Sequence, residues 1–218
     1  AGDGTVTLDA TSTYTTLGMA APVSSVQTAT RDLYFYNLTI SDNVRLNPAG
    51  YRIFVQNILM LGSGSSIGYT TGFSTAGSIQ QGGAATVAVT HSLGGSSATQ
   101  TATAPTAVTG GTNYYYQAPQ AVRGYSITGS STPPTVLRGG AGGASGAGGG
   151  VVIVAARYIS LSSGAATINA PGTAGAGGGG GGVVIIVSSA PTLLTGVTTS
   201  VVGGTGCAAG TSIYLQVP

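Results

Sequence analysis

The sequence predicts an all-β fold, built either as a β-solenoid-like coil or as stacked β-sheets, with a long irregular excursion in its middle. Glycine supplies 39 of the 218 residues and is concentrated in two runs, Gly139–Gly150 and Gly172–Gly182. Each run opens directly onto a short run of β-branched residues that contains no Gly or Pro. Such a run, bounded by glycine, is typical of a buried strand.

A repeated strand pattern is the second observation behind this prediction. Segments 51–61 (YRIFVQNILML) and 151–161 (VVIVAARYISL) align without gaps, so that Ile53 stands opposite Ile153. Both continue into a Ser- and Gly-rich corner with one isolated Ile, and a shorter copy, VVIIV, follows at 183–187. Repeats of this kind indicate β-units that bury the faces of their neighbours. The alternative, that any two Val/Ile strands look alike, stays open.

The glycine runs themselves allow two interpretations. Glycine-rich sequence commonly forms flexible linkers between domains, but only one short strand-like segment separates these two runs. Glycine is also used where backbones approach so closely that any Cβ would clash. We therefore expect packed glycine, with a flexible linker as the alternative.

The charge inventory is the third observation, and it constrains the surface. The chain has no Lys and no Glu, and its six Arg and four Asp make up 5% of the residues, against roughly 25% in typical domains. Ser, Thr, Asn, Gln and backbone must then cover the surface, which suits an extracellular particle or an ordered assembly. A net charge of +2 without a basic cluster gives no support for nucleic-acid binding.

Taken in order, residues 1–30 are rich in Thr, Ala and Ser, and we expect them to attach the chain to a larger assembly. Within them, TVTLDA alternates and predicts a strand.

Residues 31–218 are predicted to form a single glycine-rich β domain. NPAG at 47–50 predicts a hairpin or a solenoid corner. From 62 to 138 apolar residues become sparse, and we expect an irregular excursion.

Catalytic and metal-binding patterns are not found. Glycoside cleavage needs two carboxylates about 5–10 Å apart, and all four Asp precede residue 43. The only histidine, His91, lies in HSLGG, which is not a nucleophile elbow. The scattered His, Cys and Asp give no zinc or calcium spacing, and without Lys there is no GxxxxGK[ST] loop. We expect no enzymatic activity, no metal and no cofactor. No apolar run approaches the roughly 18 residues of a membrane span, so no membrane insertion is expected.

Binding is the more plausible chemistry, and tyrosines in the excursion are the candidates. Tyr114, Tyr115, Tyr116 and Tyr125 can supply rigid amphipathic contact area of the kind used in paratopes. Tyr69 and Phe73 are expected to lie nearby. The alternative is that these tyrosines pack between subunits.

The sequence also resembles a known group of proteins. NLTISDNVRLNPAGYRIFVQNILML, the HSLGG segment, and polyglycine followed by VVIVAARYISL and by VVIIV resemble glycine-rich phage structural proteins of the tail, head-fibre or decoration type. The glycine runs are similar, more distantly, to those of phage adhesins in which polyglycine segments pack as a sandwich.

The resemblance implies a non-enzymatic structural protein of the virion surface: a capsid decoration, fibre or tail-tip component. Its partners would be other virion proteins and its own copies, with a trimer favoured by analogy with phage fibres. A host cell-surface glycan or protein would be a further partner. The alternative is a secreted, extracellular adhesin or filament subunit of a bacterium or archaeon.

Overall fold

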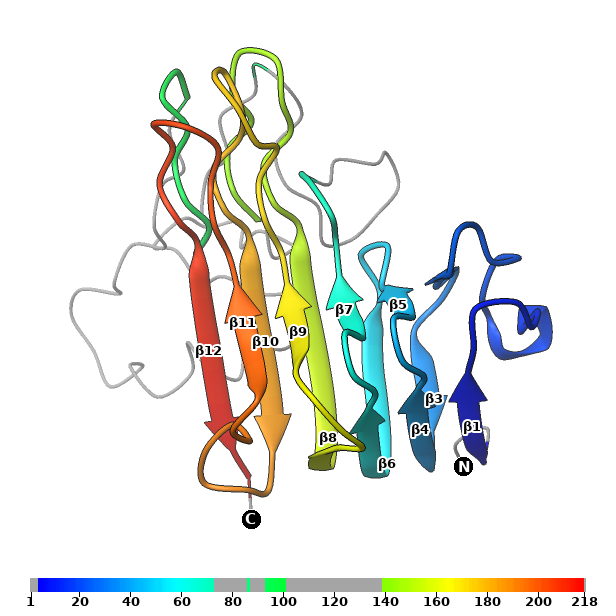
Figure 1. Ribbon diagram of the computed structural model, residues 1–218. Coiled ribbons are helices and arrows are strands. Elements are labelled where there is room, and N and C mark those ends of the chain that lie inside the picture. Colours follow the sequence, from blue (N-terminus) through cyan, green and yellow to red (C-terminus); the bar gives the residue numbers. More distant parts are fainter. Residues whose placement is uncertain (1–3, 73–85, 87–92, 101–138, 218) are drawn as a thin grey trace, which may run out of the picture.

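The computed structural model describes residues 4–72, 86, 93–100 and 139–217, and strands dominate it (Figure 1). These residues contain no α-helix and one 3-10 turn, η1 (Thr15–Leu17). Every pairing between the named strands is parallel. The all-β prediction is therefore confirmed for the described part of the chain.

The strands form two sheets. The larger sheet has the order β1-β4-β6-β8-β10-β12, with β3 also paired to β6, and the smaller sheet has the order β11-β9-β7-β5-β2. In the larger sheet the strands are β1 (Thr5–Leu8), β3 (Leu33–Phe35), β4 (Asn37–Ile40), β6 (Arg52–Leu61), β8 (Val151–Leu161), β10 (Val183–Ser188) and β12 (Thr211–Gln216). In the smaller sheet they are β2 (Val26–Thr28), β5 (Arg45–Asn47), β7 (Ser66–Gly68), β9 (Ala166–Asn169) and β11 (Val197–Ser200).

From β4 onward the described strands alternate between the two sheets along the chain. NPAG is therefore a corner between β5 and β6 and not a hairpin. Ala49 and Gly50 both have positive φ, and the amide of Tyr51 donates to the carbonyl of Pro48 at 2.8 Å. The isolated Ile residues of the repeat are stacked neighbours in the smaller sheet, with Ile67 paired to Ile168.

One continuous core lies between the sheets. Alternate residues of each strand point into it, as the two-residue period of a strand requires. In β6 these are Ile53, Val55, Leu59 and Leu61, none of which is more than 3% exposed. Equivalent inward positions on other strands belong to the same cluster: Leu38, Leu46, Ile67, Val152, Val154, Ile168, Val184 and Ile186. Burial of these apolar side chains stabilises the stack.

The predicted repeat is correct in one half of the strand and wrong in the other. Leu61 pairs with Leu161, as the alignment without gaps requires, but Ile53 pairs with Val154 and not with Ile153. A register shift between Val55 and Ile58 separates the two halves. One bulged position changes every pairing before it, which a sequence alignment does not detect.

The two segments predicted to lie outside the regular part of the domain, 1–30 and 62–138, both contain strands. The segment 1–30 contributes β1 and β2, which are edge strands of the two sheets, and its role in attachment stays a prediction. The segment 62–138 begins with regular structure, because β7 lies within it. Much of its remainder falls outside the described residues.

The upper end of the molecule in Figure 1 is a bundle of glycine-rich segments, here called the glycine apex. It comprises residues 93–97, 139–150, 170–182 and 201–210. Main-chain hydrogen bonds join these segments to one another. Gly149 donates to Gly180 at 2.8 Å, Gly180 donates to Ala141 at 2.8 Å, and Gly95 donates to Gly181 at 2.7 Å.

The central segment of the glycine apex is Gly178–Gly182. A Cβ on any of these residues would approach neighbouring backbone closer than 3.0 Å, which real Cβ atoms essentially never do. Successive residues meet different neighbouring segments, and Gly179 and Gly182, three residues apart, both meet the segment 139–150. The contacts are residues 147–148 for Gly179, 95–96 for Gly180, 201 and 210 for Gly181, and 149–150 and 170 for Gly182. The runs are packed glycine, and the linker alternative is wrong.

Candidate ligand-binding groove

The outward face of the larger sheet carries a row of side chains that crosses four strands. The parallel register places Tyr34 beside Phe54, Phe54 beside Ala155, and Ala155 beside Val187. Each of these residues lies between inward-facing neighbours. Tyr34, for example, is 49% exposed between two buried residues of β3. Alternation along the strands and register between them thus bring the row together.

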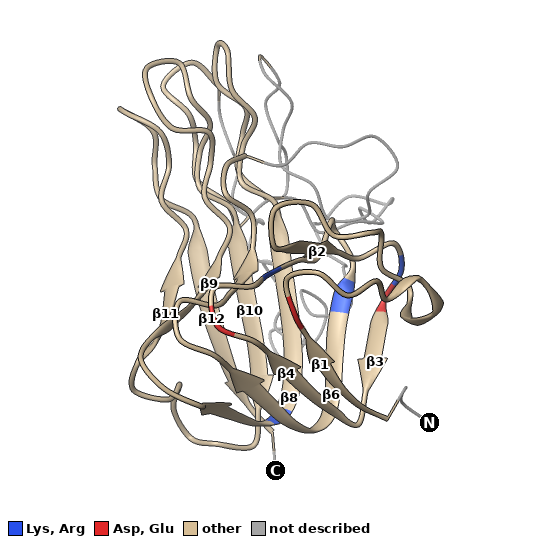
Figure 2. Cartoon of the chain, turned by 45° about the vertical axis from the view of Figure 1, so that its right-hand side comes forward, with Lys and Arg blue, Asp and Glu red and all other residues tan. Residues whose placement is uncertain are grey.

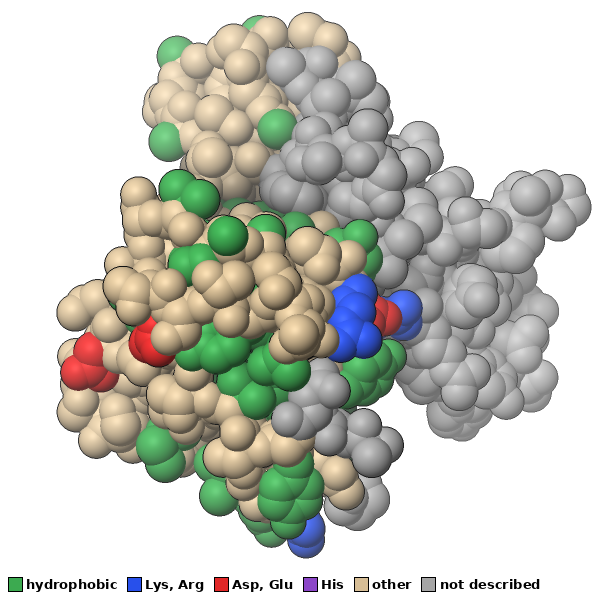
Figure 3. Space-filling model, turned by 90° about the vertical axis from the view of Figure 1, so that its right-hand side faces the viewer, with side chains coloured by type: hydrophobic (Ala, Val, Ile, Leu, Met, Phe, Trp, Pro, Cys, Tyr) green, Lys and Arg blue, Asp and Glu red, His purple; other side chains and the backbone are tan. Residues whose placement is uncertain are grey.

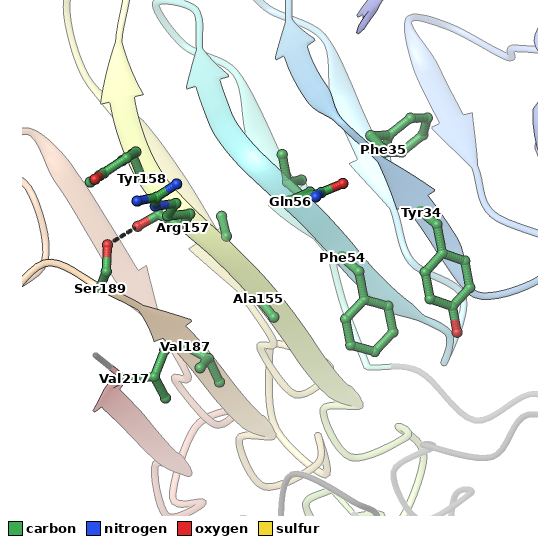
Figure 4. A pocket seen from close by; sticks show the side chains of 12 residues that line it. Tyr34, Phe35, Phe54, Gln56, Ala155, Arg157, Tyr158, Val187, Ser189 and Val217 are labelled. Atoms are coloured by element: carbon green, nitrogen blue, oxygen red, sulfur yellow. Dashed lines mark hydrogen bonds between the residues drawn. The ribbon is translucent and has the colours of Figure 1, made fainter. Parts of the chain in front are cut away.

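The aromatic end of the row is a stacked pair. The ring centroids of Tyr34 and Phe54 are 4.9 Å apart, and the ring planes differ by 9°. This separation is close to the spacing of about 4.8 Å between adjacent strands. Each ring projects from its own strand, and the two rings lie side by side (Figure 4). One face of Phe54 is covered by Tyr34, and the other faces the side of Ala155.

Ala155 forms the floor of a slot. Its methyl group is the smallest side chain in the row, and it lies between the strand of Phe54 and the strand of Val187 (Figure 4). The slot is part of an open groove of about 790 Å³. The described residues that line the groove are Tyr34, Phe35, Phe54, Val55, Gln56, Ala155, Ala156, Arg157, Tyr158, Val187, Ser189 and Val217.

Polar groups follow the slot along the same strands. The guanidinium of Arg157 lies over the ring of Tyr158, 5.2 Å from the centroid, in a cation–π contact. Within the described part of the chain this guanidinium has no hydrogen bond or ion pair. The backbone carbonyl of Arg157 accepts hydrogen bonds from Ser188 Oγ at 3.1 Å and from Ser189 Oγ at 2.6 Å. These bonds fix the strand that carries the cation.

Above the groove, the same sheet face is apolar and covered. Val151, Ile153, Val183 and Ile185 point outward but are fully buried, and Leu93 packs against them. The carbonyl of Leu93 accepts a hydrogen bond from Thr211 Oγ1 at 2.6 Å. The outward face thus divides into a covered apolar region near the glycine apex and the groove further along the strands.

The described carboxylates are not among the residues that line the groove, and they serve local structure. Asp32 binds Arg52 through an ion pair of 3.0 Å and accepts its amide at 2.8 Å. Asp42 accepts the amide of Ser63 at 2.8 Å. Asp9 accepts the hydroxyl and amide of Ser12 and the amide of Thr11, and these bonds lower the pKa of Asp9 far below its usual value.

Charge is sparse on this molecule, as Figures 2 and 3 show. The described residues of the glycine apex contain no Asp or Arg. Seen from the β1 side in Figure 3, the surface is mostly polar side chains and backbone with separate apolar patches. No cluster of three or more His, Cys, Asp or Glu in the described ranges is arranged to hold a metal ion. Among the same residues, no helix has the length and apolar character needed to cross a membrane.

The tyrosines predicted as surface contacts are not placed by the structure. Tyr114, Tyr115, Tyr116 and Tyr125 lie outside the described residues, as does Phe73. Tyr69 is described and is buried, with 3% of its surface exposed, so it offers no contact surface itself, and its expected place near the other tyrosines stays a prediction. Its hydroxyl accepts the amide of Gly50 at 3.0 Å and donates to the carbonyl of Val151 at 3.2 Å. Burial raises the pKa of Tyr69 well above its usual value.

The groove residues were not predicted from the sequence. A weak signal exists, because Phe54 and Gln56 alternate with buried residues in RIFVQ. That alternation does not reveal that Tyr34 and Arg157 lie on the same face, since they belong to strands more than 100 residues apart.

No protein-family model, curated protein or solved structure matches this chain.

Proposed function

We propose that this protein is a non-enzymatic structural component of a phage virion surface, as a capsid decoration, fibre or tail-tip protein. Binding to the host surface is its second task, and the groove on the larger sheet is the described surface best suited to it. The finer architecture that we propose is a β-solenoid, in which each turn of the chain adds one strand to each sheet.

The glycine apex carries this proposal. Its segments are packed backbone against backbone at the end of two parallel sheets. Such packing fixes several loops beside one another without large side chains or charges, and so makes a stiff, weakly charged tip. The same feature underlies the resemblance of the sequence to polyglycine-bearing phage adhesins. A stiff tip suits a protein that projects from a particle.

The described carboxylates support a non-catalytic role. Asp9, Asp32 and Asp42 are each engaged with backbone amides or with Arg52, and the lining of the groove contains none of them. Hydrolysis of a glycoside by a carboxylate pair has no candidate pair there among the described side chains.

Immunogold electron microscopy tests the proposed location. Antibodies raised against the purified chain are applied to virus particles and to cell-surface fractions from the source organism. We expect gold on the surface of virions, and mass spectrometry of purified virions should detect the chain. Labelling of cell-surface filaments, with none on virions, would contradict the proposal and favour the bacterial or archaeal adhesin or filament subunit.

A further inference from the structure

We propose that the groove on the larger sheet binds an acidic saccharide, with one sugar ring in the slot above Ala155 and its carboxylate on Arg157. This inference rests on the proposed binding task and is independent of the position of the protein on a virion. Three features of the groove carry it: the width of the slot, the face of Phe54 that is turned to the slot, and a guanidinium that has no hydrogen bond or ion pair with any described residue.

The width of the slot admits one ring. Phe54 and Val187 lie on strands to either side of β8, so their strands are about 10 Å apart. A ring between them needs two van der Waals contacts of about 3.5–4.0 Å each. The slot therefore accepts a single ring, with one face of the ring against Phe54 and the other face against Val187. A sugar ring meets this condition because its C–H groups form an apolar face while its hydroxyls point outward from the edge.

The charge of the groove selects an anion. Arg157 is exposed, and its guanidinium makes no hydrogen bond or ion pair with the described residues. The cation–π contact with Tyr158 uses no N–H group as a hydrogen-bond donor, so the guanidinium can offer its N–H groups to a bidentate carboxylate. The described lining contains no Asp to oppose an anion.

The spacing between slot and cation fits a uronic or related acid. Arg157 follows Ala155 by two residues, which is about 6.6 Å along a strand. The long side chain of Arg157 therefore starts one outward position beyond the slot, and a charge-assisted hydrogen bond of about 2.8 Å can join its guanidinium to a carboxylate carried on the bound ring. Gln56 and Ser189, which also line the groove, offer hydrogen-bonding groups of the kind that sugar hydroxyls need. An aromatic side chain of a protein partner would fit the slot but would bring no charge to Arg157.

A glycan array of the purified chain tests the proposal. The probes are tetrasaccharides that contain glucuronate, galacturonate or terminal sialic acid, each beside its counterpart in which the carboxylate is reduced to an alcohol. We expect binding of at least one acidic probe, and binding of its reduced counterpart about tenfold weaker or worse. The acidic binding should also weaken as salt is added, because the Arg157 contact is ionic.

Three variants, measured by titration calorimetry with the bound probe, locate the site. Ala155→Leu fills the slot and should abolish binding, and Arg157→Gln should weaken it by about tenfold. Ser160→Leu is the matched control, because Ser160 lies on the same strand but outside the groove lining, and it should bind like wild type. Melting temperatures close to wild type would show that the variants are folded.

Three outcomes would overturn the proposal. One is an array on which no acidic probe binds better than its reduced counterpart. Another is binding to Ala155→Leu at wild-type strength. The third is binding that Arg157→Gln does not change. Each concerns the groove alone, whereas absence of gold from virions would refute the location and leave this site intact.

Discussion

Replacement of Gly179 by Ala should destabilise the protein strongly, although it adds only one methyl group. The new Cβ would lie closer than 3.0 Å to Ala147 and to the amide nitrogen of Gly148. Both are backbone groups that cannot rotate away. Overpacking of this kind costs about 1–3 kcal/mol. The opposing gain, from the smaller entropy of an unfolded chain with Ala, is only about 0.4–1 kcal/mol.

Hydrogen bonds at the same point add to the cost. Gly179 donates to Thr173 at 3.2 Å, its carbonyl accepts from Gly204 at 2.9 Å, and Ala147 accepts from Thr173 at 3.0 Å. Separation of the segments to admit a methyl group weakens these bonds, which contribute about 0.5–1.5 kcal/mol each. We expect a total loss of about 3–5 kcal/mol. For a chain of this size that lowers the melting temperature by roughly 10 °C.

Thermal unfolding followed by circular dichroism is the assay. Gly175→Asn is the matched control in the same segment, because a Cβ there meets nothing within 4 Å and Asn tolerates the positive φ of +91°. The control should melt within a few degrees of wild type. If Gly179→Ala also melts there, the packed-glycine interpretation of the glycine apex is refuted. Gly179→Val, with two further methyl groups, should prevent folding altogether.

The remaining predictions concern pH, a buried hydroxyl and assembly. Because the pKa of Asp9 is lowered in the folded state, its contribution is present above about pH 4 and is lost as pH falls through the folded pKa. The melting temperature should therefore be nearly constant from about pH 5 to 8 and should fall in acid. The fall in acid should be smaller in the Asp9→Asn variant. A steep transition near neutral pH would contradict this prediction. Tyr69→Phe removes the partner of two buried backbone groups and should cost about 1–3 kcal/mol in urea unfolding, and an unchanged midpoint would refute that role. The raised pKa of Tyr69 predicts that wild type loses stability above about pH 10, as a folded-state pKa above the unfolded one requires. The scarcity of surface charge predicts a homo-oligomer, with a trimer favoured, and light scattering that finds a monomer at about micromolar concentration would argue against it.

The sequence by itself determined the secondary structure class of this protein and the positions of several strands and of one turn. Val and Ile runs without Gly or Pro indicated buried strands, and β8 and β10 lie where those runs are. NPAG indicated a turn, which Ala49 and Gly50 make with positive φ. These features depend on neighbours in the chain, because strand alternation and turn geometry are local properties. The prediction of packed glycine, in preference to a flexible linker, was also correct. Glycine that adjoins buried strands has little room to act as a linker.

The tertiary structure alone decided which residues meet across the strands. The bulge between Val55 and Ile58 shifts half of the β6–β8 ladder by one residue, and no local pattern marks it. The same pairing brings Phe54 beside Ala155, and so creates a slot between segments 100 residues apart. Tyr69 is buried in the fold, because the corner at Gly50 and the start of β8 converge on its hydroxyl, which its sequence neighbours do not indicate. Alternation assigns residues to the two faces of a strand, but only the packing of sheets and segments settles which face is covered and what lies beside it.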